Sequence, residues 1–167
     1  MSTRPSFIVS ASDVPERTFV YPRSTEPMGP TRRLGAAAGL VRVGINLQRL
    51  PPGCRSSWPH AESDEEEFVY VIEGNVDAWV DGRLHRMVPG DLAAFPAGTG
   101  ICHSFINNTD VEVLLLVGGE TAKPANRLFF PVNPSFREDL NESDWWHDAP
   151  ARPRGDHDGL PDRLRER

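Results

Sequence analysis

The chain has 167 residues, of which 38% are hydrophobic and 25% charged, and it contains 14 Gly and 16 Pro. This length suits one domain with long arms, because domains most often contain about 100–150 residues. The formal net charge of −6 and the lack of a basic stripe argue against nucleic acid as a partner, since phosphate binding requires clustered Lys and Arg.

Membrane and secretory features are not evident in the sequence. No apolar run approaches the ~20 residues that a membrane span needs, and no apolar segment of signal-peptide type follows a cationic start. We therefore expect a cytoplasmic protein with no membrane partner. The two cysteines, Cys54 and Cys102, are then expected to be free thiols.

The segment 1–38 lacks sustained periodicity and is interpreted as an N-terminal arm. The segment 39–118 instead consists of short, β-branched or alternating runs separated by turn signals, and Asp81-Gly82 is a strong two-residue hairpin signal. The expected strands are 40–50, 68–72, 76–80, 83–88, 92–95, 101–106 and 111–117. This spacing predicts an all-β domain, closed as an antiparallel sandwich or barrel.

The segment 119–167 is interpreted as a C-terminal extension that is partly irregular. It carries large apolar groups at 128–130 and at Trp145-Trp146, which we expect to dock on the barrel or on a second subunit, because exposed aromatic surface is costly. A short helical turn is predicted within 159–165.

Four potential metal ligands occur in the predicted barrel: His60, Glu62, Glu67 and His103. Because side chains alternate along an extended strand, His60 and Glu62 should share one face. Glu67 can point to the same interior from the next strand, and His103 comes from a later one. Cys102 should face the opposite side from His103 and so be excluded as a ligand.

These residues resemble the two motifs of the cupin superfamily. The first motif runs Gly, His-x-His, Glu, Gly, and is matched by Gly53, His60, Glu62, Glu67 and Gly74. The second runs Gly, Pro-x-Gly, His, Asn, and is matched by Gly90, Pro96, Gly98, His103 and Asn107. The resemblance covers about residues 40–118 and implies a double-stranded β-helix, or jelly roll. Glu62 departs from it, standing where the family usually has a second histidine.

Two histidines and one glutamate form a set that suits Fe(II), and also Mn, Ni or Zn, with open positions for a substrate. The second carboxylate leaves two roles open for Glu62: a fourth ligand, or a catalytic general base beside a divalent metal ion. The remaining histidines, His85, His147 and His157, are interpreted as structural.

The expected function is that of a metal-dependent enzyme acting on a small organic molecule, by dioxygenase, isomerase or lyase chemistry. The alternative is a non-catalytic barrel that binds a sugar or another small molecule without turnover. We also expect a homodimer in which the N-terminal arm or the segment 120–150 covers a sheet edge of the partner, because uncovered edges invite aggregation.

Overall fold

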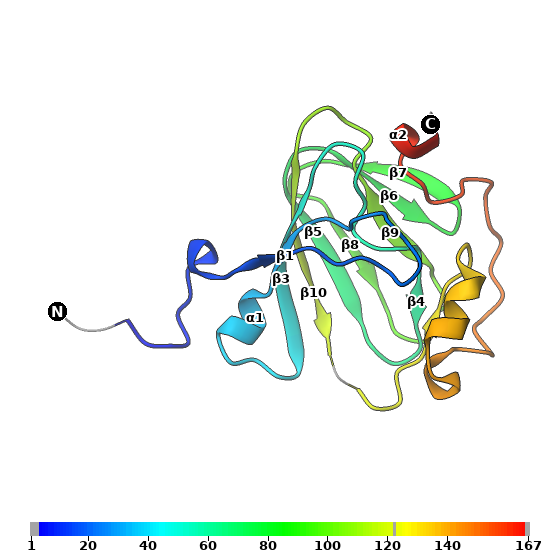
Figure 1. The fold of residues 1–167 in the computed structure, drawn as a ribbon, viewed down its shortest axis with the longest axis horizontal. Coiled ribbons are helices and arrows are strands. Elements are labelled where there is room, and N and C mark those ends of the chain that lie inside the picture. Colours follow the sequence, from blue (N-terminus) through cyan, green and yellow to red (C-terminus); the bar gives the residue numbers. More distant parts are fainter. Residues whose placement is uncertain (1–3, 122, 166–167) are drawn as a thin grey trace.

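The computed structural model describes residues 4–121 and 123–165, and these form a two-layer, antiparallel β-barrel (Figure 1). The larger layer is a six-stranded sheet with the spatial order β1-β2-β3-β10-β5-β8. Its strands are β1 (Glu16–Arg17), β2 (Thr31–Arg32), β3 (Val43–Leu50), β10 (Val113–Glu120), β5 (Glu67–Glu73) and β8 (Leu92–Phe95). The prediction of an all-β, antiparallel domain is confirmed.

The second layer is built from two smaller sheets that share one irregular segment. They have the spatial orders β7-β6-β9 and β11-β4. Their strands are β7 (Arg83–Met87), β6 (Val76–Val80), β9 (His103–Ile106), β11 (Leu128–Phe129) and β4 (Ala61–Glu62). Isolated bridges join Arg55 to Ile106 and His60 to His103, so the residues before β4 run beside β9 and connect the two sheets.

The segment interpreted as an N-terminal arm contributes directly to the larger sheet. β1 pairs with β2, and β2 pairs with β3, although each of these two strands has only two residues. Strands this short have no measurable alternation, so periodicity could not reveal them. The residues before β1 extend away from the body of the molecule (Figure 1) and contain a 3-10 helix at Ala11–Asp13.

The turn at Asp81-Gly82 forms the predicted hairpin between β6 and β7. Both residues have positive φ, 47° and 81°, which is the pattern of the turn type that matches strand twist. Gly82 also lies against the C-terminal extension, because a Cβ added there would come within 2.3 Å of the Gly155 carbonyl oxygen. This position therefore requires glycine for two separate reasons.

The C-terminal extension packs on the outer face of the second layer, as its aromatic residues predicted. Trp146 is buried with Trp79, Cys102 and Ile106, and Phe130, Phe136 and Trp145 form an adjacent buried cluster. The extension contains 3-10 helices at Pro134–Asp139 and Glu142–Asp144 and ends in the helix α2 (Asp162–Arg165), within the helical turn predicted for 159–165.

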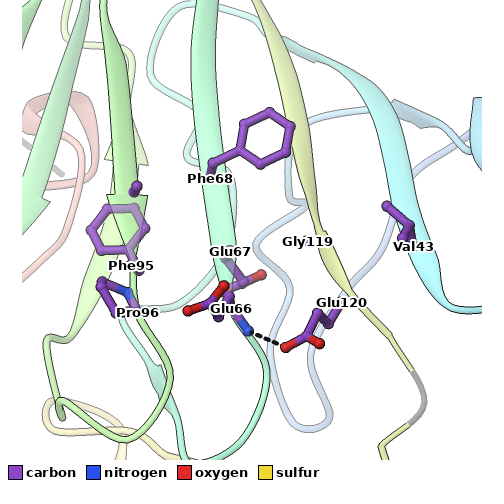
Figure 2. Close-up of a pocket in the computed structure, with 9 residues that line it drawn as sticks. Val43, Glu66, Glu67, Phe68, Phe95, Pro96, Gly119 and Glu120 are labelled. Atoms are coloured by element: carbon purple, nitrogen blue, oxygen red, sulfur yellow. Dashed lines mark hydrogen bonds between the residues drawn. The ribbon is translucent and has the colours of Figure 1, made fainter.

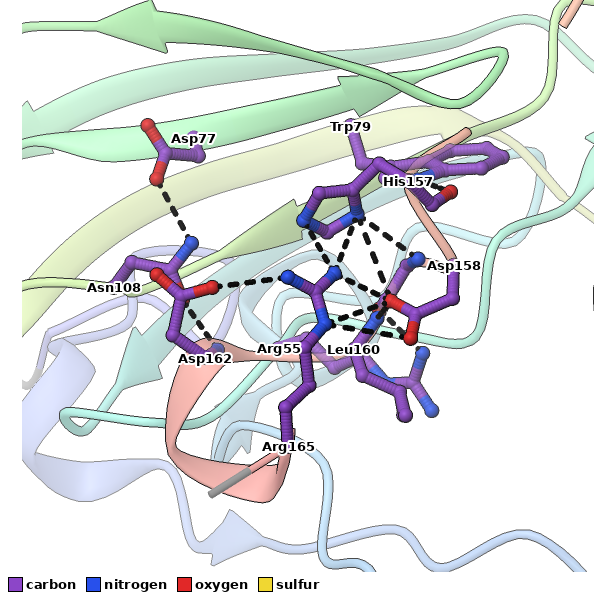
Figure 3. A network of polar contacts seen from close by, with 10 residues as sticks. Arg55, Asp77, Trp79, Asn108, His157, Asp158, Leu160, Asp162 and Arg165 are labelled. Atoms are coloured by element: carbon purple, nitrogen blue, oxygen red, sulfur yellow. Dashed lines mark hydrogen bonds and ion pairs between the residues drawn. The ribbon is translucent and has the colours of Figure 1, made fainter. Parts of the chain in front are cut away.

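A network of polar contacts attaches the last described residues to the barrel (Figure 3). The buried Arg55 guanidinium donates to the Gly159 carbonyl oxygen at 2.6 Å, and the Trp79 indole donates to the His157 carbonyl oxygen at 2.8 Å. Arg55 also forms an ion pair with Glu26, so segments from both ends of the chain contact the irregular segment before β4. Within the described residues, no helix is long and apolar enough to cross a membrane.

The barrel interior changes character along its length. We call one half the closed end, where the inward side chains are buried and apolar. They are Leu50, Val71, Phe105, Val113 and Leu115. We call the other half the open end, where the inward side chains are polar or titratable. They are Asn46, Gln48, His60, Glu67 and His103. The short helix α1 (Leu34–Ala37) packs on β3 beside the open end.

Candidate metal centre

Two neighbouring backbone segments bring the two histidines together at the open end. His60 and His103 exchange both backbone hydrogen bonds, at 3.1 and 2.9 Å, so they lie directly opposite each other. Their ring centroids are 5.0 Å apart. Such directly paired residues on adjacent strands project to the same face of the layer, which here is the barrel interior. His60 lies one residue before β4, and His103 begins β9.

Glu67 reaches the same point from the opposite layer, where it begins β5. Its Oε2 atom lies 3.1 Å from His103 Nε2 and 3.5 Å from His60 Nε2. Gly119 pairs with Glu67 across the sheet, and a Cβ at position 119 would come within 2.4 Å of the Glu66 carbonyl oxygen. Glycine on β10 therefore lets the start of β5 approach closely.

The three side chains fit a divalent ion. Their candidate ligand atoms all lie within 4.8 Å of one another. Ligands at about 2.1 Å from one ion are separated by about 3.0 Å at a right angle and about 3.4 Å in a tetrahedron, close to the separations of Glu67 Oε2 from the two imidazoles. Glu67 Oε2 is also buried, and it has no hydrogen-bond partner among the described residues. An ion held by the three side chains would satisfy this buried oxygen.

The far nitrogen of each imidazole is directed at a backbone carbonyl. His60 Nδ1 lies 2.9 Å from the Trp58 carbonyl oxygen, and His103 Nδ1 lies 3.4 Å from that of Ile101. Because a carbonyl oxygen only accepts, the Nδ1 hydrogen of His60 points to Trp58 and leaves Nε2 for an ion. The His103 ring stacks on Phe95 at a centroid distance of 3.6 Å, which holds its orientation.

The electrostatics follow from two buried imidazoles beside one buried carboxylate. Burial alone would raise the pKa of Glu67, but the two histidines outweigh it and hold this pKa below its usual range. Burial opposes protonation of His60, but the Glu67 carboxylate outweighs it and raises the pKa of His60 to about 9. His103 shows the reverse, because burial dominates and lowers its pKa. The Glu67 carboxylate thus already attracts positive charge.

Glu62, the fourth expected residue, lies beside this group rather than in it. Its Oε1 atom is 3.9 Å from His60 Nε2, and its Oε2 atom accepts a 2.6 Å hydrogen bond from the Asn126 amide. Burial and, after it, the charge of Glu67 raise the pKa of Glu62 to about 7. Asn126 was not identified from the sequence, because it lies 64 residues away in the irregular extension.

The three remaining histidines of the chain lie outside this group. His85 is exposed on β7, His147 lies 3.0 Å from a carboxylate oxygen of Glu142, and His157 contacts Arg165 in the C-terminal network. The interpretation of Cys102 agrees with the structure, because its side chain packs with Trp79 and Trp146 on the outer face while His103 faces inward. Both cysteines are free.

A cavity of about 180 Å³ adjoins the three converging side chains inside the barrel. Besides them, its wall includes Thr31, Asn46, Gln48, Ser56 and Ser57. Sequence reasoning did not identify Asn46 and Gln48 as site residues, although alternation along 40–50 places both on the same face as the buried Leu50. A second cavity, of about 300 Å³, lies at the rim, where Figure 2 shows Glu67 beside Glu66, Phe95 and Glu120.

Comparison with known proteins gives a consistent picture of the fold. The family model for the cupin domain matches residues 46–118. This match includes all four of the expected site residues. No curated protein matches the chain in sequence.

Several solved structures are similar over most of the chain. One is a sugar phosphate isomerase from a cupin superfamily, from Silicibacter pomeroyi, with 38% identity over 74% of this chain and 80% of that chain and a TM-score of 0.66. A proposed sugar phosphate isomerase from Acidithiobacillus ferrooxidans has 26% identity over 75% and 81% of the two chains, with a TM-score of 0.69. The polyketide cyclase RemF from Streptomyces resistomycificus has 23% identity over 87% and 100%, with a TM-score of 0.61, which supports the fold alone.

Proposed function

Because this chain belongs to the cupin superfamily, we propose that it is a metal-dependent enzyme that isomerises a small hydroxycarbonyl compound. The observation that carries the proposal is the buried Glu67 Oε2 atom, which lacks a hydrogen-bond partner among the described residues and lies within 3.5 Å of two imidazole nitrogens. Fold alone does not determine a reaction, so the proposal rests on these side chains and on Glu62.

In this proposal His60, Glu67 and His103 hold the ion, with Glu62 as a further ligand or as the base. Two imidazoles with carboxylate oxygens suit Fe, Mn, Ni or Zn. When bound, such an ion would polarise a substrate carbonyl and so acidify the neighbouring C–H bond. The Trp58 carbonyl oxygen orients the His60 ring, and stacking on Phe95 orients the His103 ring.

Glu62 is the proposed proton carrier. Burial and the neighbouring Glu67 charge raise the pKa of Glu62 above its usual range, which favours a carboxyl group that can both take up and return a proton. The Asn126 amide donates to Oε2 and leaves Oε1 directed toward His60. Glu62 would take the proton from the hydroxyl-bearing carbon beside the carbonyl and return it to the former carbonyl carbon. The hydroxyl proton would pass to the former carbonyl oxygen, so that the hydroxyl and carbonyl groups exchange places.

The isomerase assignment is supported by the name of the relative with 38% identity. Dioxygenases and lyases can use a metal ion with the same histidine and carboxylate ligands, so the test includes these two reactions as outcomes. Metal-loaded protein is incubated in D₂O with dihydroxyacetone or glyceraldehyde, and proton NMR follows the carbon-bound hydrogens. We expect deuterium incorporation that Glu62→Gln slows at least about 100-fold, the usual contribution of a positioned base. Oxygen consumption or C–C cleavage instead would reject the isomerase.

Metal content tests the site itself. Purified protein, His60→Ala, His103→Ala and, as a matched control, His85→Ala are analysed for Fe, Mn, Ni and Zn. We expect close to one ion per chain in the natural protein and in His85→Ala, and loss in the other two variants. Equal metal content in all four proteins, or none in any, would reject the metal centre. Small-molecule binding by metal-free protein would then favour the non-catalytic barrel.

We further propose a homodimer formed through the arm that precedes β1. Figure 1 shows this arm extending away from the barrel. Phe7 is 70% exposed, and Leu92, on the outer face of the six-stranded sheet, is 59% exposed. Exposed apolar groups on an extended arm and on a sheet face favour burial between two copies. Light scattering should show a dimer, and the double variant Phe7→Ser/Ile8→Ser should shift the protein toward monomer. A natural protein that is monomeric would reject the homodimer.

A further inference from the structure

The inner cavity offers no cationic side chain to a ligand. Among the described residues that line it, no Lys or Arg is present, and the only charged groups are the candidate metal ligands themselves. Enzymes that hold phosphate groups use Arg, Lys or helix N-termini for that purpose, because an anion without such partners is poorly compensated away from water. A phosphate or carboxylate group inside this cavity would therefore find, among the described residues, no positively charged side chain apart from the candidate metal ligands and their ion.

The rim of the cavity is strongly acidic. Besides Glu67, four carboxylates line the cavities that surround its mouth: Glu62, Glu65, Glu66 and Glu120. Lys123 is already bound to Glu120 at 2.6 Å, and Arg33 lines the same mouth as Glu65 and Glu120. Clefts lined by one sign of charge lower the local concentration of ligands of that sign. The rim thus favours the entry of a divalent cation and disfavours an anionic substrate.

Gln48 presents a fixed hydrogen-bond acceptor on the inner wall. Its side chain is buried, and its amide NH₂ donates at 3.1 Å to the carbonyl oxygens of Gly29 and Ser56. Both hydrogens of the Gln48 amide are used in this way, so the only group that the side chain can offer to a ligand is its oxygen, an acceptor. A ligand that occupies the cavity must supply a donor, such as a hydroxyl group, to satisfy this oxygen.

Asn46 lies two residues earlier on β3 and faces the same cavity. It lines both the inner cavity and the mouth, together with Glu67 and Val117. Its side-chain amide forms no hydrogen bond with any residue in the described parts of the chain, so both its donor and its acceptor are available. Asn46 can therefore contact the part of a ligand that lies between the ion and the mouth.

From these features we propose that the cavity selects an uncharged hydroxycarbonyl compound over its phosphate ester, with Asn46 and Gln48 as the specificity-determining residues. This inference rests on the proposed function and narrows its substrate class. It differs from the activity for which the 38% identical Silicibacter pomeroyi protein is named, that of a sugar phosphate isomerase. A ligand that lacks the matching hydrogen-bonding group leaves buried polar side chains unpaired, and its binding is therefore weakened by a large factor. The polar wall gains its selectivity in this way.

Calorimetric titration of the metal-loaded full chain tests the inference with two matched pairs of probes. The pairs are dihydroxyacetone with dihydroxyacetone phosphate, and glyceraldehyde with glyceraldehyde 3-phosphate. We expect the uncharged member of at least one pair to bind at least about ten times more tightly than its ester. Equal or tighter binding of both esters, or no binding of either uncharged compound, would overturn the inference.

Two variants assign the selectivity to residues. Asn46→Val should weaken binding of the uncharged probe about ten-fold or more while metal content and melting temperature are maintained. Arg33→Ala should leave binding of the uncharged probe unchanged. If the natural protein instead prefers the ester, and Arg33→Ala weakens ester binding, the phosphate group lies at the mouth and the inference is overturned. Metal content separates the two proposals: protein without metal contradicts the proposed function, and metal-loaded protein that prefers esters contradicts only the substrate class.

Discussion

The closed and open ends of the barrel are built from the same strands, yet they differ completely in chemistry. On β3 the inward positions change from Leu50 through Gln48 to Asn46, and on β5 they change from Val71 through Val69 to Glu67. Both strands pair with β10 along most of their length, with one register shift in the β5 pairing, between Leu114 and Leu115. The closed end can therefore provide the stability of the fold, while the open end carries polar groups that the fold does not need.

The largest effect on stability is expected at the closed end. Phe105 is 1% exposed and packs between the two layers. Phe105→Ala should destabilise the fold by about 3–5 kcal/mol, because it removes buried surface and leaves a cavity. Urea unfolding of metal-free protein measures this change. A loss of less than about 1 kcal/mol would show that the closed end does not dominate stability.

The open end should contribute to stability chiefly through the ion. At a free metal concentration of 100 times Kd, binding should stabilise the natural protein by about 2.7 kcal/mol. Glu67→Gln should abolish most of this gain, because it removes the carboxylate between the two imidazoles. Urea unfolding with and without metal measures the difference. Glu73→Gln, at the far end of β5, is the control and should keep the full gain.

A polar group at the open end should be nearly dispensable for folding. Asn46→Val is expected to change the stability of the metal-free protein by less than about 1 kcal/mol, because the amide has no partner to lose and valine favours strands. Thermal melting of metal-free protein checks this, with Val71→Asn as the reciprocal variant. Val71 is fully buried, so an unpaired amide there should cost more than Asn46→Val. Similar effects of the two variants would remove the distinction between the ends.

The smallest effect is expected on the outer face beside the closed end. Arg49 donates to both oxygens of Glu16, at 2.9 and 2.6 Å, and this contact lowers the pKa of Glu16. Partly exposed pairs contribute about 0.2–1 kcal/mol. Because the pKa is lowered on folding, this stability is present above pH 4.5 and is lost as the pH falls through the folded value. Glu16→Gln should therefore differ from the natural protein at neutral pH but not in strong acid.

Much of the barrel could be predicted from local patterns. Alternation and turn residues identified both ends of each longer strand to within three residues, and Asp81-Gly82 specified its hairpin, because such signals depend on a few neighbouring residues. The strands β1, β2, β4 and β11 were not predicted, since each has two residues and depends on its partner strand. The docking of the C-terminal aromatic residues, on the barrel or on a second subunit, was predicted from the cost of exposing them to water.

For the candidate site, the sequence by itself determined which residue types are available and, through strand alternation, that His60 and Glu62 can share one face. Only the tertiary structure decided that His60, Glu67 and His103 converge and that Glu62 instead lies beside them, held by Asn126. It also decided that Asn46 and Gln48 form the opposite wall. Spacing along a strand specifies the face on which a side chain lies, whereas the distance between side chains of different strands depends on how the layers pack.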